Sequence, residues 1–284
     1  MFNAQIKKIT IGLIIPIFVV SCSDKAAEAT EKASNLYEQA DSLFESGYYE
    51  QALTLLDSID KTYQQAFEIR KSVSKLRPQV MERWSAKQLS VTDSLLVESQ
   101  ILGNNLRQQL IYVKNPLEGY FVASSTGNVN VRDVQGLHGR ISPAFKFYLT
   151  SSCPQKIQSV AVRLEADGEF VDSAIIPYDG ERNNRSGKCE TITFTEAESA
   201  LLGEFVKKHS DSEISIIFIS DKQKEHKIIM TNANKSALLT GYSYAQVVIR
   251  DKQLLLEKAR LEKQIELSRQ QIARTQSNNP QTEE

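Results

Sequence analysis

Apolar residues recur at helical spacing near both ends of the chain and at strand spacing between them. Over residues 33–76 they repeat every three or four positions on either side of Gly47, which predicts a helical hairpin and then a helix from about residue 62 to 76. Pro78 is expected to end or kink that helix. Residues 80–113 carry one narrow apolar stripe at spacings of three, four and seven, which predicts a single long helix.

A second narrow stripe follows over residues 243–274, and Ser243 to Gln246 resembles a capping box at its start. Because neither long helix can bury its stripe alone, we expect the two to pack antiparallel. The facing residues are expected to be Leu95, Leu102 and Leu106 on the first helix and Leu254, Leu261 and Ile265 on the second. A homodimeric coiled coil is the alternative. The polar residues 275–284 predict a disordered tail.

Between the two long helices, residues 116–242 consist of short runs rich in β-branched and aromatic residues, with turn residues between them. The strand-like runs are GYFVAS, FKFYLTSS, IQSVAVRLEADGEFVDSAII, ETITF, EISIIFIS and HKIIMT. Asp167-Gly168 predicts a tight hairpin turn, and Thr195 with Glu198 predicts a capping box that opens a helix over residues 196–209.

Together these patterns predict an α+β fold. An N-terminal helical hairpin is followed by a long antiparallel helix pair, to which each end of the chain contributes one helix. The inserted module is β-rich and mainly antiparallel, and at least one helix covers it.

The first 21 residues have the composition of an export signal. Lys7 and Lys8 precede an apolar run from Ile9 to Val20. This run is too short to span a bilayer, since a spanning helix needs roughly 20 apolar residues.

The apolar run ends in Val19-Val20-Ser21-Cys22, which resembles the lipobox of bacterial lipoproteins. The resemblance implies cleavage after Ser21 and acylation of Cys22, with palmitate among the attached chains, so that the protein is held to a membrane. Ser23 implies, by the same resemblance, delivery to the outer membrane. Residues 22–32, rich in Ala, Glu and Lys, are then expected to form a tether. The alternatives are an ordinary secretory signal with an incidental cysteine, or a short buried helix.

The segment from Leu36 to Ile59 resembles one tetratricopeptide hairpin. The matched positions are Ala40, Gly47, Tyr49 and Ala52: small residues where the helices cross, a glycine at the turn and an aromatic ring beside it. Stacks of this family need about three repeats to bury a continuous core. The favoured interpretation is therefore a hairpin that packs on the next helix, and a peptide-binding groove is the alternative.

Charge argues against binding to nucleic acid. The chain has 34 Lys+Arg and 35 Asp+Glu, and removing residues 1–21 takes away two lysines and leaves 32 against 35, a net charge of −3. A duplex-binding surface requires an excess of Lys and Arg, whereas here both signs are mixed along the chain.

Two further cysteines, Cys153 and Cys189, allow a disulfide in an oxidising compartment, and two buried thiols are an equally supported alternative. A metal or redox site is less well supported. The cysteines form no CxxC pair, and the three histidines, His138, His209 and His226, lie far apart in the sequence.

The segment GLHGR, residues 136–140, is the strongest candidate for a binding loop. Its two glycines would let backbone amides approach an anion beside His138 and Arg140, although such a segment more often forms only a turn. Residues 178–188 predict a solvated hairpin loop. GNVNVRD resembles the Asn-Val-Arg signature of bacterial SH3-like wall-binding domains, but the residues that follow depart from that family.

The sequence contains no GxSxG, HExxH or phosphate-loop motif, so we predict no catalytic, cofactor-binding or metal-binding residues. Its organisation resembles that of lipoproteins from Bacteroides-type cell envelopes. We expect a lipid-anchored, non-enzymatic envelope protein that presents its β-rich module to a protein or glycan partner. The alternative is an envelope hydrolase or a small-ligand-binding lipoprotein with its site in that module. A deep hollow with converging polar groups would favour the hydrolase or small-ligand-binding protein. A flat apolar patch would favour the non-enzymatic protein that presents its module to a partner.

Overall fold

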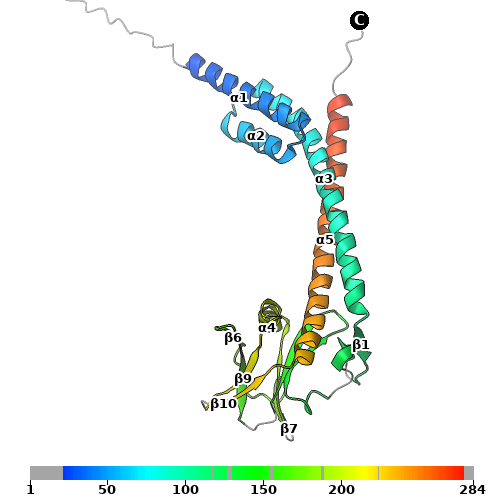
Figure 1. Cartoon of the computed structure of the whole chain (residues 1–284). Helices are drawn as coiled ribbons and strands as arrows, with labels where there is room; N and C mark the ends of the chain where they lie inside the picture. Colours follow the sequence, from blue (N-terminus) through cyan, green and yellow to red (C-terminus); the bar gives the residue numbers. More distant parts are fainter. Residues whose placement is uncertain are drawn as a thin grey trace, which may run out of the picture. The chain divides into compact units, whose positions relative to one another are not determined.

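The computed structural model describes residues 22–277 apart from 117, 127–129, 154–156, 187–188 and 223, and of residues 22–25 it describes only the backbone. The predicted signal peptide, residues 1–21, and residues 278–284 of the predicted tail lie outside the described residues. The fold is α+β as predicted, with helices at both ends and antiparallel sheets inserted between α3 and α5 (Figure 1). The chain divides into two units, one of residues 1–90 with 259–284 and one of residues 91–258.

The first unit contains a helical hairpin, α1 (Cys22–Glu45) and α2 (Tyr49–Thr62), and the start of α3 (Phe67–Arg107). The segment predicted as a tether, residues 22–32, is helical and belongs to α1. An ion pair of 2.7 Å between Lys32 Nζ and Glu28 Oε1 spans one turn of this segment. Exposed pairs at this spacing support a helix only weakly.

The hairpin turns at Gly47, whose φ of +77° is a conformation that residues with a Cβ rarely adopt. The Tyr48 N–H donates to the Leu43 carbonyl at 2.9 Å, and the Gly47 N–H donates to the Phe44 carbonyl at 3.0 Å. These two bonds form a Schellman motif, which satisfies carbonyls at the end of α1 and directs the chain into α2.

Ala40, Ala52 and Tyr49, three of the tetratricopeptide-like positions, lie in or against the core of this unit. Ala40 and Ala52 are fully buried, and the Tyr49 ring lies 6.0 Å from that of Phe44. The buried core of this unit also includes residues of α3, so the hairpin packs on the following helix. Its members are Ala33, Ala40, Ala52, Leu56, Ile59, Ala66, Val73, Leu76 and Val80.

The helix that follows the hairpin does not end at Pro78. It continues through Pro78 as part of α3, although proline removes one helical hydrogen bond. Val73, Leu76 and Val80 on both sides of Pro78 are buried in the core of the unit. Their packing holds the turns before and after the proline in one helix and overrides the local preference.

The long helices α3 and α5 (Asn232–Ser277) lie side by side, as predicted (Figure 1). In the first unit Arg269 Nε lies 2.7 Å from Glu82 Oε1, and in the second Lys258 Nζ lies 2.7 Å from Asp93 Oδ1. Residue numbers therefore fall along α5 as they rise along α3, which makes the pair antiparallel.

The seam between these helices is more polar than predicted. Leu261 and Ile265 are buried as expected, but Leu102 is 47% exposed, so that part of the prediction is wrong. A heptad-like spacing of buried and half-buried positions marks the seam on both helices. On α3 they are Ser85, Leu89, Thr92, Leu96, Ser99, Gly103 and Leu106, and on α5 they are Val247, Asp251, Leu254, Lys258, Leu261, Ile265, Ser268 and Ile272.

Both long helices differ in length from the prediction. The first ends at Arg107 instead of residue 113, because residues 110–113 form a strand. The last begins at Asn232 instead of residue 243. At its start the Thr231 hydroxyl accepts the Asn234 N–H at 3.1 Å, a side-chain cap that the sequence analysis missed.

The second unit contains two antiparallel sheets, one of six strands in the order β1-β2-β3-β4-β8-β7 and one of four in the order β10-β9-β5-β6. The strands are β1 (Leu110–Val113), β2 (Tyr120–Ala123), β3 (Gly136–Ile141), β4 (Phe147–Cys153), β5 (Ser159–Ala166), β6 (Glu169–Asp172), β7 (Asn183–Ser186), β8 (Cys189–Phe194), β9 (Ser215–Ser220) and β10 (Glu225–Ile229). A short 3-10 helix, η1 (Ser124–Thr126), follows β2, and α4 (Glu196–Lys208) follows β8.

The six predicted strand runs are all confirmed, but β1, β3 and β7 were not predicted as strands. The strand β7 lies inside the segment predicted as a solvated loop, and its Asn183 is fully buried. The Asp167-Gly168 hairpin turn is confirmed, with φ of 52° and 78°, as is the capping box of α4.

Both sheets contribute to one core. Leu149 and Ile192 from the six-stranded sheet and Leu164 and Ile216 from the four-stranded sheet are fully buried in it. The helix α4 and the start of α5 add further apolar side chains, Leu202, Phe205, Val206, Leu238 and Tyr242 among them. This shared core fixes the position of α5 against the sheets of the second unit.

A buried tyrosine joins the two helices of this core. The Tyr242 hydroxyl donates to Glu204 Oε2 at 2.9 Å, and the ring occupies the space where a Cβ on Gly203 would lie, 2.5 Å from Tyr242 Cδ2. Burial is the main cause and the hydrogen bond to Glu204 the second, and together they raise the pKa of Tyr242 to about 12.

We expect the stability of the protein to fall as the pH rises from about 10 through 12, and Tyr242→Phe to lose part of that pH dependence. The folded state holds the phenol proton more tightly than the unfolded state, so this contribution is complete below the unfolded pKa near 10. The free energy of unfolding, measured with urea at pH 8 and pH 11, tests this in both proteins. An equal fall in the free energy of unfolding between pH 8 and pH 11 in both proteins would contradict this prediction.

Of the two arrangements that the sequence allows for Cys153 and Cys189, the disulfide is not formed. Cys153 and Cys189 are both buried and are not bonded to each other. The strand register pairs Cys153 with Glu190, so Cys189 faces the opposite side of the sheet. Ser152 shares the side of Cys189, and its Oγ lies 3.0 Å from the Cys189 Sγ. The alternative of two buried thiols therefore holds.

Candidate functional site

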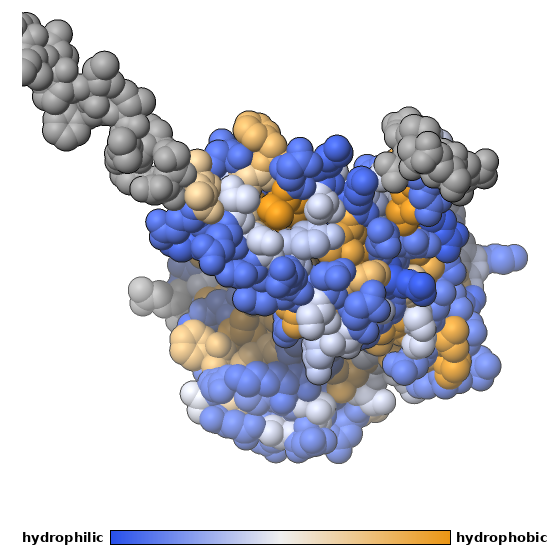
Figure 2. Space-filling view, turned by 90° about the horizontal axis from the view of Figure 1, so that it is seen from above, coloured by the Kyte–Doolittle hydropathy of each residue, from blue (hydrophilic) through white to orange (hydrophobic). Residues whose placement is uncertain are grey.

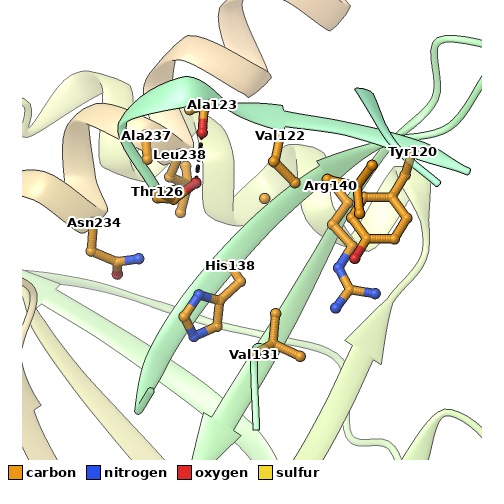
Figure 3. Close-up of a pocket in the computed structure, with 12 residues that line it drawn as sticks. Tyr120, Val122, Ala123, Thr126, Val131, His138, Arg140, Asn234, Ala237 and Leu238 are labelled. Carbon is orange, nitrogen blue, oxygen red and sulfur yellow. Dashed lines mark hydrogen bonds between the residues drawn. The ribbon is translucent and has the colours of Figure 1, made fainter. Parts of the chain in front are cut away.

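A hollow lies at the edge of β3 in the second unit, where β2 and β3 diverge. These strands pair only through Phe121 and Ile141, and the start of α5 closes the space beyond. The hollow encloses about 460 Å³ including its open mouth. Figure 3 shows side chains from β2, β3 and α5 around it, with Asn234 and Arg140 on opposite sides of the view.

Two glycines of GLHGR allow the close packing beneath this hollow. A Cβ on Gly139 would lie 2.9 Å from Phe147 Cε2, closer than such atoms approach. Gly136 has a φ of 137° and lies against the side chain of Asn234. The Asn234 Nδ2 donates to the Leu137 carbonyl at 2.6 Å, which ties the first turn of α5 to β3. The segment predicted as a loop is therefore strand β3, and its glycines make room for neighbouring side chains.

His138 is a neutral imidazole at neutral pH. Burial is the main cause that lowers its pKa, and the charge of Arg140 acts in the same direction, whereas the bond to the Val134 carbonyl opposes them. The His138 Nε2 lies 2.8 Å from the Val134 oxygen. Because a carbonyl only accepts, Nε2 carries the proton and Nδ1 is left as an acceptor.

Arg140 provides the positive charge of the hollow. Its Cζ lies 4.6 Å from the centre of the Tyr120 ring, and its buried Nε has no hydrogen-bond partner. Two other arginines of this unit bind carboxylates: Arg163 Nε lies 2.7 Å from Asp172 Oδ1, and Arg182 pairs with Glu198. Arg185, which lies over Tyr178, also has a buried Nε without a hydrogen-bond partner, but it does not line the hollow. Among the described residues that line the hollow there is no acid. A buried donor without an acceptor is costly, so an anion bound here would gain that hydrogen bond.

The remaining polar groups hold the lining of the hollow in place and are not reactive. The Thr126 hydroxyl donates to the Ala123 carbonyl at 2.7 Å (Figure 3). The first turn of α5 adds the positive end of a helix dipole. The described part of the lining thus contains one imidazole, one guanidinium and no carboxylate, an arrangement that can bind an anion.

The structure brings together His138 and Arg140, the two residues that the sequence analysis placed in a binding segment. Tyr120 and Asn234 were missed, since both are far away in sequence. Cys22 is the first residue of α1, its side chain is not described, and the lipobox residues before it lie outside the described residues.

Among the described residues, no three His, Cys, Asp or Glu side chains lie together in a way that could hold a metal ion. No helix in that part of the chain has the length and apolar character needed to cross a membrane. No protein-family model matches the chain, and a search among curated proteins gives no match.

Proposed function

We propose that this chain is a lipid-anchored cell-envelope protein of the interaction type, which binds an anionic group of its partner in the hollow at His138 and Arg140. The single observation that carries the binding proposal is the buried Nε of Arg140, which has no acceptor in a hollow whose described lining residues include no acid. The lipobox-like sequence before Cys22 supports the anchor, with the outer membrane as the proposed location.

One face of the protein also favours a polar ligand over a broad apolar one. On the face seen in Figure 2, hydrophobic residues are scattered among hydrophilic ones and form no large continuous patch. Scattered apolar residues are usual on soluble surfaces, whereas protein docking sites present contiguous ones. A carboxylate or phosphate group on a partner molecule suits the hollow better than an apolar side chain.

We expect sulfate, used as the probe, to bind the hollow and to shift the NMR signals of the His138 ring but not those of His209 and His226. Arg140→Gln should weaken this binding at least about tenfold, since the charge-assisted bond is lost. Affinity should also rise as the pH falls through the pKa of His138, which lies below the ordinary histidine value of about 6.5, because protonated His138 adds a second positive charge and sulfate keeps its own charge.

The matched control is Arg163→Gln, which removes a guanidinium of the same unit that binds Asp172 outside the hollow. It should leave sulfate affinity unchanged. Equal affinity in the parent protein and in Arg140→Gln would overturn the proposed binding function, as would equal shifts of all three histidines.

A further inference from the structure

A second hollow, in the first unit, is lined by aromatic rings and uncharged hydrogen-bonding groups. It lies where the hairpin turn meets α3, and it measures about 470 Å³ including the part open to solvent. Its lining consists of Gly47, Tyr48, Tyr49, Glu50, Gln51, Trp84, Lys87 and Gln88. No residue of the hollow at β3 takes part in it.

The aromatic residues of this hollow are available to a ligand. Tyr48 is 58% exposed, and its side chain makes no capping hydrogen bond at the start of α2. Trp84 and Tyr49 are half-buried, so each keeps part of its ring surface in solvent. Tyrosine and tryptophan combine a flat apolar face with a polar group, and they are enriched where a ligand has both kinds of surface.

The polar residues around these rings suit hydroxyl groups. The side-chain amides of Gln51 and Gln88 can each donate and accept hydrogen bonds, as a hydroxyl can. Glu50 and Lys87 carry opposite charges, so the lining has no net charge and attracts neither anions nor cations over long range. Lys87 Nζ lies 5.9 Å from the centre of the Tyr49 ring, which holds the ammonium beside the aromatic surface.

A ligand that matches this lining is neutral, has flat apolar faces and carries many groups that both donate and accept. A sugar ring has these properties, because its C–H groups form apolar faces and its hydroxyls point outward around the edge. An extended peptide would need a row of alternating backbone donors and acceptors. The helices and turn that form this hollow offer only the N–H groups of the first turn of α2, which have no partner within that helix.

We propose that the hollow beside Trp84 is a binding site for a neutral glycan, whose sugar ring packs against Tyr48 and Trp84 while Gln51 and Gln88 bind its hydroxyls. This site is separate from the anion-binding hollow. It gives the protein a second point of attachment with a different ligand chemistry.

Trp84 makes the proposal directly testable, because the chain contains a single tryptophan. Its fluorescence therefore reports on this hollow alone. Cellotetraose, maltotetraose and chitotetraose, each titrated into the purified full chain, serve as neutral sugar probes, and a proline-rich decapeptide serves as the competing class. We expect at least one sugar to change the Trp84 emission saturably and the peptide to leave it unchanged.

Tyr48→Ser is the test variant, and Phe67→Ser is its matched control. Both replace an exposed aromatic residue of the same unit, since Phe67 is 74% exposed, but Phe67 does not line the hollow. Serine is also a favourable residue at the start of a helix, so Tyr48→Ser should fold. Sugar affinity should fall at least about tenfold in Tyr48→Ser and stay unchanged in Phe67→Ser.

Three results would overturn the glycan proposal: no emission change with any of the sugars, a change with the peptide alone, or equal affinity in Tyr48→Ser. Each of them leaves the sulfate experiment unaffected, since that probe concerns residues of the other unit.

Discussion

Replacing Leu261 with alanine is expected to lower the free energy of unfolding by about 2–5 kcal/mol. Leu261 is fully buried in the seam between α3 and α5. Removing its side chain loses transfer free energy and leaves a cavity, which the two long helices can close only in part. Urea unfolding followed by circular dichroism measures the change.

The matched control is Leu256→Ala, which makes the same substitution on the same helix. Leu256 is 73% exposed, so the expected change is within about 0.5 kcal/mol. If the two substitutions have equal effects on unfolding, Leu261 does not pack in a helix seam and the paired arrangement of α3 and α5 is contradicted.

Local signals in the sequence predicted local structure well. The Thr195–Glu198 capping box, the Asp167-Gly168 turn and the turn at Gly47 all lie where expected, because each depends on residues within a few positions of one another. The antiparallel pairing of the two long helices was also predicted, since a narrow apolar stripe on a long helix needs a partner.

The detailed seam could not be predicted from apolar residues. Ser85 and Ser99 are buried in it, whereas Leu102 is exposed. Small residues let two helices approach closely, so position in the heptad and not hydrophobicity decides which side chain is buried. A pattern search that follows only leucines and valines misses Ser85 and Ser99 and wrongly includes Leu102.

The candidate site was predicted only in part. His138 and Arg140 are neighbours in sequence, but Tyr120 and Asn234 come from β2 and α5, and no sequence spacing connects them. The two glycines suggested a loop because glycine is disfavoured in strands. In the structure Gly139 is required by the close approach of Phe147, a tertiary contact that the local pattern does not contain.

Replacing Cys22 with serine is expected to have the largest effect on the behaviour of the protein in the cell. Each buried methylene of an acyl chain contributes about 0.8 kcal/mol, so two or three chains hold a protein on a membrane almost irreversibly. A hydroxyl cannot form the thioether through which the proposed lipid anchor would be attached to Cys22. The change should therefore move the protein from entirely membrane-bound to soluble. Ser23→Ala, one residue later, is the matched control and should keep the anchor.

The most direct test of the proposed envelope anchor combines metabolic labelling with an alkyne analogue of palmitate and fractionation of the labelled cells. We predict that the parent protein and Ser23→Ala carry the label and sediment with the membranes, whereas Cys22→Ser carries none and stays in the soluble fraction. Membrane association of Cys22→Ser equal to that of the parent, or a parent protein without label, would contradict the lipid anchor.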